Sequence, residues 1–482
     1  MRRDLAADRL ANNFASSLDE YKSIRGEINN LENSMNGNDT NAYNETDLTL
    51  NQTNANNPHQ QKDELLNRER DSAYQGLMWL KRYSQLSMHN DINEVAKQGG
   101  SDMASICLKI IKDQQNEDNT TIGNESASSE SVQVPEAILT EGIKVLHSDS
   151  QWRLIRILKQ IEPPSESDIL ELKTYMEEIF SILHFCLCQK HETVSELREI
   201  AFTSICDLLQ NFGPTLIDPS DISCYDRSSC LEPLIYNSNE DLNYELVNFI
   251  KDRCFKNTEK EDEKFVNENL NTEDEKIAAK IEIVQIRRKL LAGLCKLIVF
   301  RRLPMSTASA IFANYIRSFT DYGDIIKHTI SKCREINQIE LAKTLVAALI
   351  ELFEEIQENI NQSSSSLSSS QVDLGTQDFS HIKELGRRFS LTFGLEQYKI
   401  RDAIASLHKD GIDFALKDWP SENISIPPRN SAFFDILQEF SGKLMKQDRQ
   451  VVMEYLRKCI DTGSRGNSKF ILGLGFCFMY FF

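Results

Sequence analysis

An apolar pattern that repeats at intervals of three and four residues constrains the fold of this chain more than any other feature. Such spacing places apolar side chains along one stripe of a helix. In one segment the stripe ends at Gly213-Pro214, a pair that stops a helix, and similar stripes occupy residues 290–298, 342–356 and 436–444. Alternating apolar and polar runs bounded by hairpin turns are absent from the sequence. The chain is therefore predicted to be all-α. The stripe before Gly213 consists of Leu197, Ile200, Ala201, Ile205, Leu208, Leu209 and Phe212.

Helices with one apolar stripe cannot bury it alone and must stack on their neighbours. The chain has 482 residues, which is more than one compact core normally organises. No sharp sequence period indicates tetratricopeptide or ankyrin repeats, so the degenerate HEAT type of armadillo-like fold is favoured. We therefore expect a HEAT-type helical-repeat solenoid (α-α superhelix) with long disordered inserts. Its extended curved surface would bind a polypeptide or a nucleic acid along its length.

Polar segments that are poor in large apolar residues interrupt the helical pattern. They cannot offset the entropy of ordering, so they are predicted to be disordered loops. The predicted organisation is a helical segment at 1–32, an Asn-rich insert at 33–62, helical repeats at 63–112, an insert at 113–133, helical repeats at 134–255, an acidic loop at 256–276, helical repeats at 277–361, a Ser-rich loop at 362–378, helical repeats at 379–461 and an atypical apolar tail at 462–482.

The formal net charge of −19 argues against attraction to nucleic acid or anionic lipid over the whole surface. Local basic clusters are still present. Each could contact phosphate or could form a solvated helix face, and the sequence leaves both readings open. The clusters are Arg287, Arg288 and Lys289; Arg301 and Arg302; and Lys383, Arg387 and Arg388.

The eleven cysteines show no spacing typical of a disulfide framework and are interpreted as reduced core thiols of an intracellular protein. Cys186 and Cys188 lie near His184 and His191, but no second cysteine pair stands at zinc-site spacing, and a helix would put the two thiols on different faces. Phosphate-binding loops, dinucleotide fingerprints, nucleophile elbows and zinc-protease helices are also absent from the sequence. We predict no metal, no cofactor and no enzymatic activity.

Neither end of the chain predicts export or membrane insertion. The N-terminal MRRDLAADRL lacks the apolar core of a signal peptide. The C-terminal FILGLGFCFMYFF is strongly apolar but shorter than the roughly 20 residues that a helix needs to cross a bilayer. No membrane association is expected.

Two charged segments, one around Asp321 and Asp324 and the other at Lys409-Asp410-Gly411, are predicted to be turns between helices. Each could be a recognition site, or it could simply cap or terminate a helix. Gly411 suits a left-handed helix terminus. Two aromatic pairs at helical intervals, Phe389 with Phe393 and Phe433 with Phe440, are expected in the core rather than in a peptide-docking groove.

Four segments in this order resemble the cohesin subunit SA (stromal antigen, stromalin) family, in the middle-to-C-terminal part of its helical-repeat body. A looser likeness extends back through residues 151–255. From about Thr462 onward the sequence departs from the family, which indicates either an incomplete or misjoined gene model or a genuine variant terminus. The segments are RRKLLAGLCKLIVF (287–300), DYGDIIKHTISKCREINQIELAKTLVAALIELFEE (321–355), IKELGRRFSLTFGLEQYKIRDAIASLHKDGIDFALK (382–417) and PPRNSAFFDILQEFSGKLMKQDRQVV (427–452).

The resemblance implies a nuclear, chromosome-associated scaffold that is not an enzyme. It implies binding to the kleisin subunit of cohesin, and through the kleisin to the structural-maintenance-of-chromosomes ATPases, together with cohesin loading and release regulators and DNA. The role implied is in sister-chromatid cohesion and chromosome segregation. The family's kleisin contacts correspond to Asp324 and Lys409, while Lys383, Arg387 and Arg388 match the family pattern as possible DNA or partner contacts.

Other functions are compatible with composition alone. A cytoplasmic transport or trafficking adaptor can be built on the same kind of solenoid, and copurification with cargo or coat proteins would identify one. The hypothesis that the chain is a hydrolase is supported by no candidate catalytic residue in the sequence.

Overall fold

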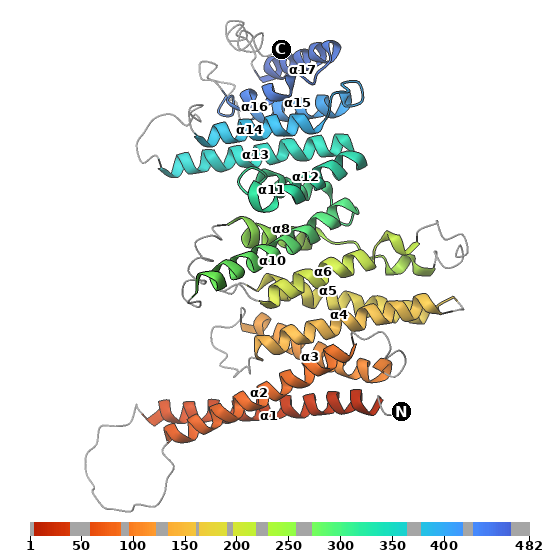
Figure 1. The fold of residues 1–482 in the computed structure, drawn as a ribbon, viewed down its shortest axis with the longest axis vertical. Coiled ribbons are helices and arrows are strands. Elements are labelled where there is room, and N and C mark those ends of the chain that lie inside the picture. The colour runs from red at the N-terminus through yellow and green to blue at the C-terminus, as the bar shows by residue number, and fades with distance from the viewer. Residues whose placement is uncertain are drawn as a thin grey trace, which may run out of the picture. The chain divides into compact units, whose positions relative to one another are not determined.

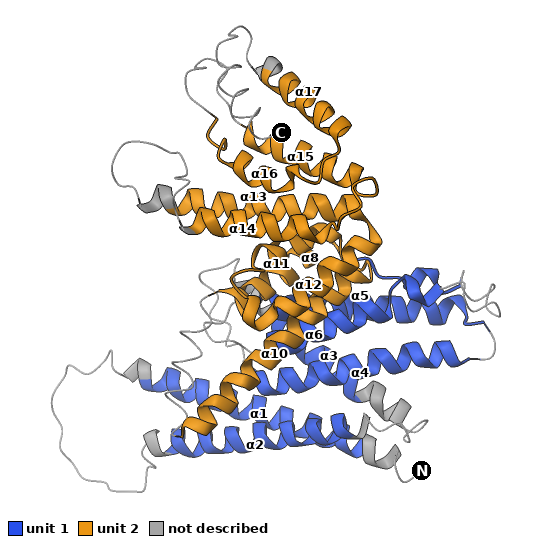
Figure 2. Cartoon of the chain, turned by 45° about the horizontal axis from the view of Figure 1, so that its top comes forward, with its two compact units in different colours: residues 1–237 blue, residues 238–482 orange. Residues whose placement is uncertain are grey.

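Every regular element in the described part of the chain is a helix, which confirms the predicted all-α helical-repeat class (Figure 1). The structure is a computed structural model, and two compact units divide the chain, residues 1–237 and residues 238–482 (Figure 2). It describes residues 4–38, 58–87, 96–121, 134–160, 163–189, 196–217, 230–256, 272–363, 377–417 and 428–463.

In the first unit, each helix packs against the next helix in the sequence, the next but one, or both. The first helix packs on the second and third, the fourth packs on the second, third, fifth and sixth, and the fifth packs on the sixth. This nearest-neighbour pattern is the one expected of stacked helical repeats. The elements are α1 (Asp4–Asn38), α2 (Pro58–Ser87), α3 (Ala96–Thr121), α4 (Glu136–Lys159), α5 (Glu166–Cys188), α6 (Glu196–Asn211), η1 (Pro214–Ile217) and η3 (Glu232–Leu234).

Local sequence explains where these helices begin and which face they bury. The hydroxyl of Ser165 accepts a hydrogen bond from the backbone N–H of Asp168 at 3.1 Å and so caps α5. α6 ends at Asn211, two residues before Gly213, so Gly213-Pro214 marks the helix end as predicted. The predicted apolar stripe of α6 is almost entirely buried, so tertiary packing holds the helix in place.

In the second unit, α13 is the central helix and packs against α11, α12, α14 and α15. Its stripe is buried along its length, and Phe353 meets Phe414 and Phe433 edge-on at ring-centroid distances of 5.8 and 5.5 Å. The four aromatics predicted for the core are buried. The elements are α8 (Glu240–Ile250), the π-helical turn η4 (Lys251–Phe255), α10 (Glu273–Val299), η5 (Met305–Ala308), α11 (Ser309–Ala313), α12 (Phe319–Ile336), α13 (Gln338–Ser363), α14 (Gln377–Thr392), α15 (Arg401–Ala415), α16 (Phe433–Ser441) and α17 (Lys446–Gly463).

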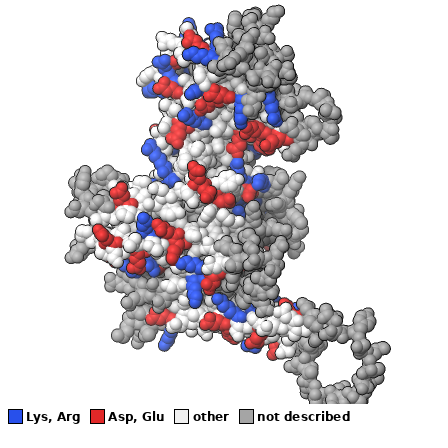
Figure 3. All heavy atoms as spheres, turned by 180° about the vertical axis from the view of Figure 1, so that it is seen from behind, with Lys and Arg blue, Asp and Glu red and all other residues white. Residues whose placement is uncertain are grey.

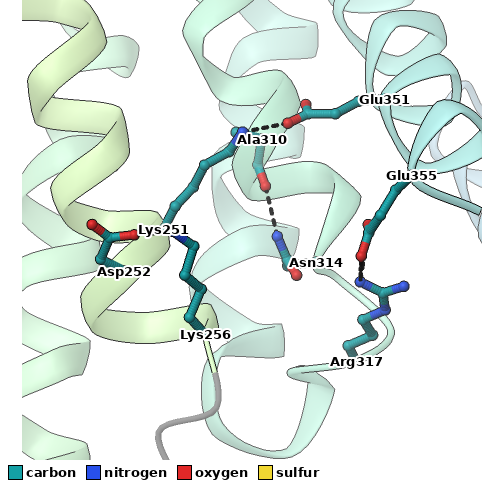
Figure 4. Close-up of polar contacts among 8 residues, drawn as sticks. All are labelled: Lys251, Asp252, Lys256, Ala310, Asn314, Arg317, Glu351 and Glu355. Atoms are coloured by element: carbon teal, nitrogen blue, oxygen red, sulfur yellow. Dashed lines mark hydrogen bonds and ion pairs between the residues drawn. The ribbon is translucent and has the colours of Figure 1, made fainter. Parts of the chain in front are cut away.

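Ion pairs join the outer face of α13 to earlier elements of this unit (Figure 4). Glu351 accepts from Lys251 of η4, and one turn further along, Glu355 accepts from Arg317 at 3.1 Å. Arg317 lies in the turn that follows α11. Since all four side chains are at least one-third exposed, these contacts orient neighbouring elements more than they stabilise the fold.

Helices extend into the segments for which disorder is predicted. α1 continues to Asn38 and α2 begins at Pro58, so both flanks of 33–62 are helical. α3, α10, α13 and α14 similarly reach into the other predicted inserts, and α17 ends at Gly463, within the segment predicted as an apolar tail. Once a helix is nucleated, polar residues extend it at little cost in free energy. The helices therefore run past the insert boundaries that composition predicts. The remainder of each insert, and residues 464–482 of the apolar tail, lie outside the described residues.

Both charged segments expected at turns are instead helical, which corrects the sequence interpretation. Asp321 and Asp324 lie in the first turns of α12, and Lys409-Asp410-Gly411 lies inside α15. In the described chain the glycine with positive φ is Gly394, at 77°, and not Gly411. Gly411 instead lets α16 approach, because a Cβ there would lie 2.5 Å from Cδ2 of Leu437.

A Gly411→Ala substitution should therefore destabilise the protein. Alanine favours a helix interior over glycine by up to about 1 kcal/mol, but overpacking against the buried Leu437 side chain opposes this, and we expect a net loss of about 1–2 kcal/mol. The midpoint of urea unfolding measures the effect. Gly442→Ala is the control, since nothing lies within 4 Å of a Cβ added there. Equal midpoints for the two variants would contradict the packing argument.

A buried histidine in α15 predicts a dependence of stability on pH. His408 is 1 % exposed, its Nδ1 donates to the carbonyl of Ile404 at 2.8 Å, and burial lowers its pKa to about 4. At a pH below the ordinary histidine pKa of 6.5, the unfolded chain binds a proton at His408 and the folded chain does not. The free energy of unfolding therefore falls as the pH falls. From this site alone we expect a loss of about 2 kcal/mol between about pH 7 and about pH 5.

Urea unfolding at the two pH values checks this expectation. His408→Gln keeps a donor for the Ile404 carbonyl and does not titrate, so its stability should depend less on pH than that of the wild type. His328→Gln, at an exposed position on α12, should behave like the wild type. If His408→Gln retains the full pH dependence, the histidine is not its source.

Candidate partner-binding surface

Asp324 points outward from α12. Tyr322, Ile326 and Ile330 on the same helix are buried, whereas the side chain of Asp324 is 67 % exposed. A helix that buries one stripe presents its opposite face to solvent. Asp324 is therefore held on a well-anchored helix and remains open to a partner.

Arg288 of α10 holds the Asp324 carboxylate with two hydrogen bonds. Its Nη1 donates to Oδ1 at 3.0 Å and its Nη2 donates to Oδ2 at 2.5 Å, while Nη1 also donates to the backbone carbonyl of Asp321. The hydrogen bond from Arg288 is the largest cause of a lowered pKa at Asp324, and the pKa of Arg288 is raised in return. The carboxylate is thus ionised and fixed in orientation.

The basic cluster around Arg288 does not form a common basic face. Arg287 is buried, Arg288 pairs with Asp324, and Lys289 is exposed. Arg301 has a φ of 57° in the turn after α10, and burial lowers the pKa of Arg302. These two clusters therefore offer little concentrated positive charge to phosphate.

The basic residues of α14 have acidic neighbours. Arg387 and Arg388 both donate to Glu384, at 2.8 and 3.1 Å, and Nζ of Lys383 lies 4.0 Å from Glu439. Where side chains are described on the face shown in Figure 3, Lys and Arg are interspersed with Asp and Glu. Of the three predicted contacts, Arg387 is the most exposed, at 65 %.

Arg388 also lies over aromatic rings near the start of α12. Its guanidinium carbon is 5.1 Å from the ring centroid of Phe319 and 6.0 Å from that of Tyr315. Phe319 is 51 % exposed. An arginine that packs on aromatic rings and pairs with Glu384 is less available to phosphate, so Arg388 is the weaker candidate.

Lys409 is exposed on α15, beside α17. Its Nζ lies 5.8 Å from the ring centroid of Tyr455, whose hydroxyl donates to Oδ1 of Asp413 at 2.6 Å. Burial and this hydrogen bond raise the pKa of Tyr455, and burial raises that of Asp410. The ammonium group of Lys409 is thus placed against an aromatic ring with two acidic residues on its own helix.

The structure relates Asp324 and Lys409 through one shared helix. α12 and α15, which carry them, both pack against α13. The sequence marked both charged segments as possible recognition sites, and the family resemblance then implied that Asp324 and Lys409 are the kleisin contacts. The sequence did not identify the neighbours that orient them, Arg288 beside Asp324 and Tyr455 beside Lys409, because each contact joins residues far apart in the sequence. The one signal in the sequence was the presence of Arg288 in a basic cluster on the preceding long helix.

The described residues contain neither a metal-ligand cluster nor a membrane-spanning helix. Cys186 is buried on α5 and Cys188 is half-buried, while His191 lies outside the described residues. The described part of the chain contains no group of three or more His, Cys, Asp or Glu side chains arranged to hold a metal ion. None of its helices has the length and apolar character needed to cross a bilayer.

Comparison with known proteins gives consistent matches. Residues 338–470 match the model of the STAG protein C-terminal domain. The chain is 37 % identical over 323 residues to cohesin subunit SA-1 of Xenopus laevis, which covers 67 % of this chain and 24 % of that protein. It is 31 % identical over 337 residues to cohesin subunit SA-3 of Rattus norvegicus, covering 70 % and 24 %. It is 32 % identical over 314 residues to cohesin subunit scc-3 of Caenorhabditis elegans, covering 65 % and 25 %. The chain thus spans about a quarter of the length of the curated relatives it matches.

Proposed function

Because the chain belongs to the cohesin subunit SA family, we propose that it is a non-catalytic scaffold subunit of cohesin that binds the kleisin subunit and helps engage DNA. It would act in sister-chromatid cohesion and chromosome segregation, at chromosomes in the nucleus. The structural-maintenance-of-chromosomes ATPases would be reached through the kleisin, and loading and release regulators would bind the same scaffold. The transport-adaptor alternative rests only on a helical fold that both kinds of protein share.

One observation supports kleisin binding most strongly: Asp324 and Lys409 are exposed on two helices that pack on the same central helix, α13. Opposite charges at fixed positions can fix the register and direction of an extended peptide, while neighbouring side chains supply contact area. Truncating a charge that becomes desolvated in an interface typically costs several kcal/mol. The two residues are therefore proposed as charged anchors for the central segment of the kleisin.

The proposal predicts that reversing either charge weakens kleisin binding. Asp324→Lys and Lys409→Glu should each reduce the affinity for the central kleisin segment by about tenfold or more, because each removes a proposed contact group and puts the opposite charge in its place. Isothermal titration with the whole 482-residue chain measures the affinity, and circular dichroism checks that each variant is folded.

Glu355→Lys is the matched control, because it also reverses an exposed carboxylate that pairs with an arginine of the same unit. Its affinity should stay within about twofold of the wild type. Wild-type affinity in Asp324→Lys and Lys409→Glu would overturn the assignment of the two anchors.

For DNA, Arg387 is the proposed phosphate contact of α14, with Lys383 and Arg388 in supporting positions. Arg387→Glu should weaken binding to duplex DNA and reduce the slope of log affinity against log salt by about one. Fluorescence anisotropy across a salt series measures both quantities. Lys332→Glu, which alters another exposed cation paired with a glutamate three residues away, is the control. Equal slopes for Arg387→Glu and the wild type would remove Arg387 from the DNA surface.

A further inference from the structure

Arg288 is not among the kleisin contacts that the family resemblance implies, yet it donates two hydrogen bonds to the proposed anchor Asp324. We propose that Arg288 is the positioning residue of this anchor: it presents the Asp324 carboxylate as half of a neutral pair that accepts hydrogen bonds from uncharged donors of the bound kleisin segment. The inference rests on the proposed function, since it specifies how the same site recognises its partner.

The first argument is the geometry of the pair. Each terminal nitrogen of the guanidinium meets a different carboxylate oxygen, at 3.0 and 2.5 Å. Two ionised oxygens have about four lone-pair sites, and this arrangement uses one on each. The remaining sites are accessible, because the Asp324 side chain is 67 % exposed whereas that of Arg288 is 27 % exposed. Arg288 thus occupies the inner side of the carboxylate and leaves the outer side open.

The second argument is that Arg288 is itself fixed. Its Nη1 also donates to the backbone carbonyl of Asp321, so the guanidinium is tied to the α12 backbone as well as to the carboxylate. A planar fork held at three acceptor atoms has little freedom to follow an incoming ligand. An unsupported aspartate on an exposed helix face would lose side-chain freedom on binding, and pre-orientation removes that cost.

The chemistry of the recognised group follows from the charge balance. The guanidinium at hydrogen-bond distance offsets the carboxylate charge, so attraction for a distant cation is weak, while the open lone pairs still accept hydrogen bonds. Backbone N–H groups, hydroxyls and side-chain amides of an extended peptide are such donors. An interaction of this kind depends little on ionic strength, unlike that of an isolated surface carboxylate with a lysine.

The test uses titration of the whole chain with the central kleisin segment. Arg288→Met should reduce the affinity about three- to tenfold, because the anchor is no longer pre-oriented. Arg288→Lys, which keeps the charge but lacks the fork, should lose most of the same affinity. The double variant Arg288→Met with Asp324→Ala should bind no more weakly than Asp324→Ala alone, since Arg288 acts through Asp324. The ratio of wild-type affinity to that of the double variant should stay constant between about 50 and 300 mM salt, because the two proteins carry the same local net charge.

A charge exchange separates this role from a purely structural one. Combining Arg288→Asp with Asp324→Arg remakes an ion pair between α10 and α12. The thermal unfolding midpoint of this exchanged variant should lie closer to that of the wild type than the midpoint of either single substitution, while its kleisin binding should remain as weak as theirs. Recovery of binding in the exchanged variant would show that the pair only stabilises the packing of α10 on α12, which would overturn both the inference and the assignment of Asp324 as an anchor. Wild-type affinity in Arg288→Met would overturn the inference while leaving the proposed function intact. Failure of the wild-type chain to bind the kleisin segment would overturn the proposed function and the inference together.

Discussion

The apolar stripe of α13 has to be covered on several sides, and the arrangement of the second unit depends on that requirement. Leu341, Leu345, Leu349 and Phe353 are buried within a single helix. A helix that carries this much apolar surface gains stability only when neighbours exclude water from it. α11, α12, α14 and α15 provide that cover. Because each of those helices turns one face towards α13, its opposite face is left to solvent. Asp324 and Lys409 lie on such solvent-facing surfaces.

Charged contacts in this unit are better understood as devices that orient helices than as sources of stability. The chain is strongly acidic, yet several carboxylates pair with arginine or lysine from another element. Exposed pairs of this type contribute little free energy. Arg401 with Asp448 is a more buried example, because the Asp448 carboxylate is only 9 % exposed and accepts three hydrogen bonds from the guanidinium of Arg401, which joins α15 to α17. Arg288 with Asp324 is the pair in which orientation bears most directly on the proposed function.

The fold class could be predicted from residues such as Leu197, Ala201, Ile205 and Leu208, because the periodicity of a buried stripe is a local property. The helix end before Gly213-Pro214 could also be predicted, but the roles of Gly411 and Gly323 could not. Gly411 was interpreted as a helix terminus, and Gly323 lies in the segment around Asp321 and Asp324 that was expected at a turn. Both lie within helices, where a Cβ would come too close to Leu437 and to Phe319 respectively. The sequence alone does not distinguish a glycine that ends a helix from a glycine that lets another side chain pack closely against the helix, because the difference lies in the tertiary structure.

The candidate site could be predicted only in part: its two proposed anchors were identified, but the residue that orients Asp324 was not. The family resemblance implied Asp324 and Lys409 as contacts, and both side chains are exposed in the structure. Arg288 looked like part of a basic cluster with Arg287 and Lys289. Its separation from both neighbours depends on the packing of α10 on α12, a contact between residues 36 positions apart. No local pattern encodes such a pairing.

Hydrogen exchange of the whole chain, with and without the central kleisin segment, tests the central claim most directly. Backbone amides exchange more slowly where a bound segment suppresses local opening. If the stacked helices of the second unit hold the kleisin through α12 and α15, exchange should slow in residues 319–336 and 401–415, and should stay unchanged in α5 of the first unit. Slower exchange confined to other helices, with α12 and α15 unaffected by a saturating amount of the segment, would contradict the account.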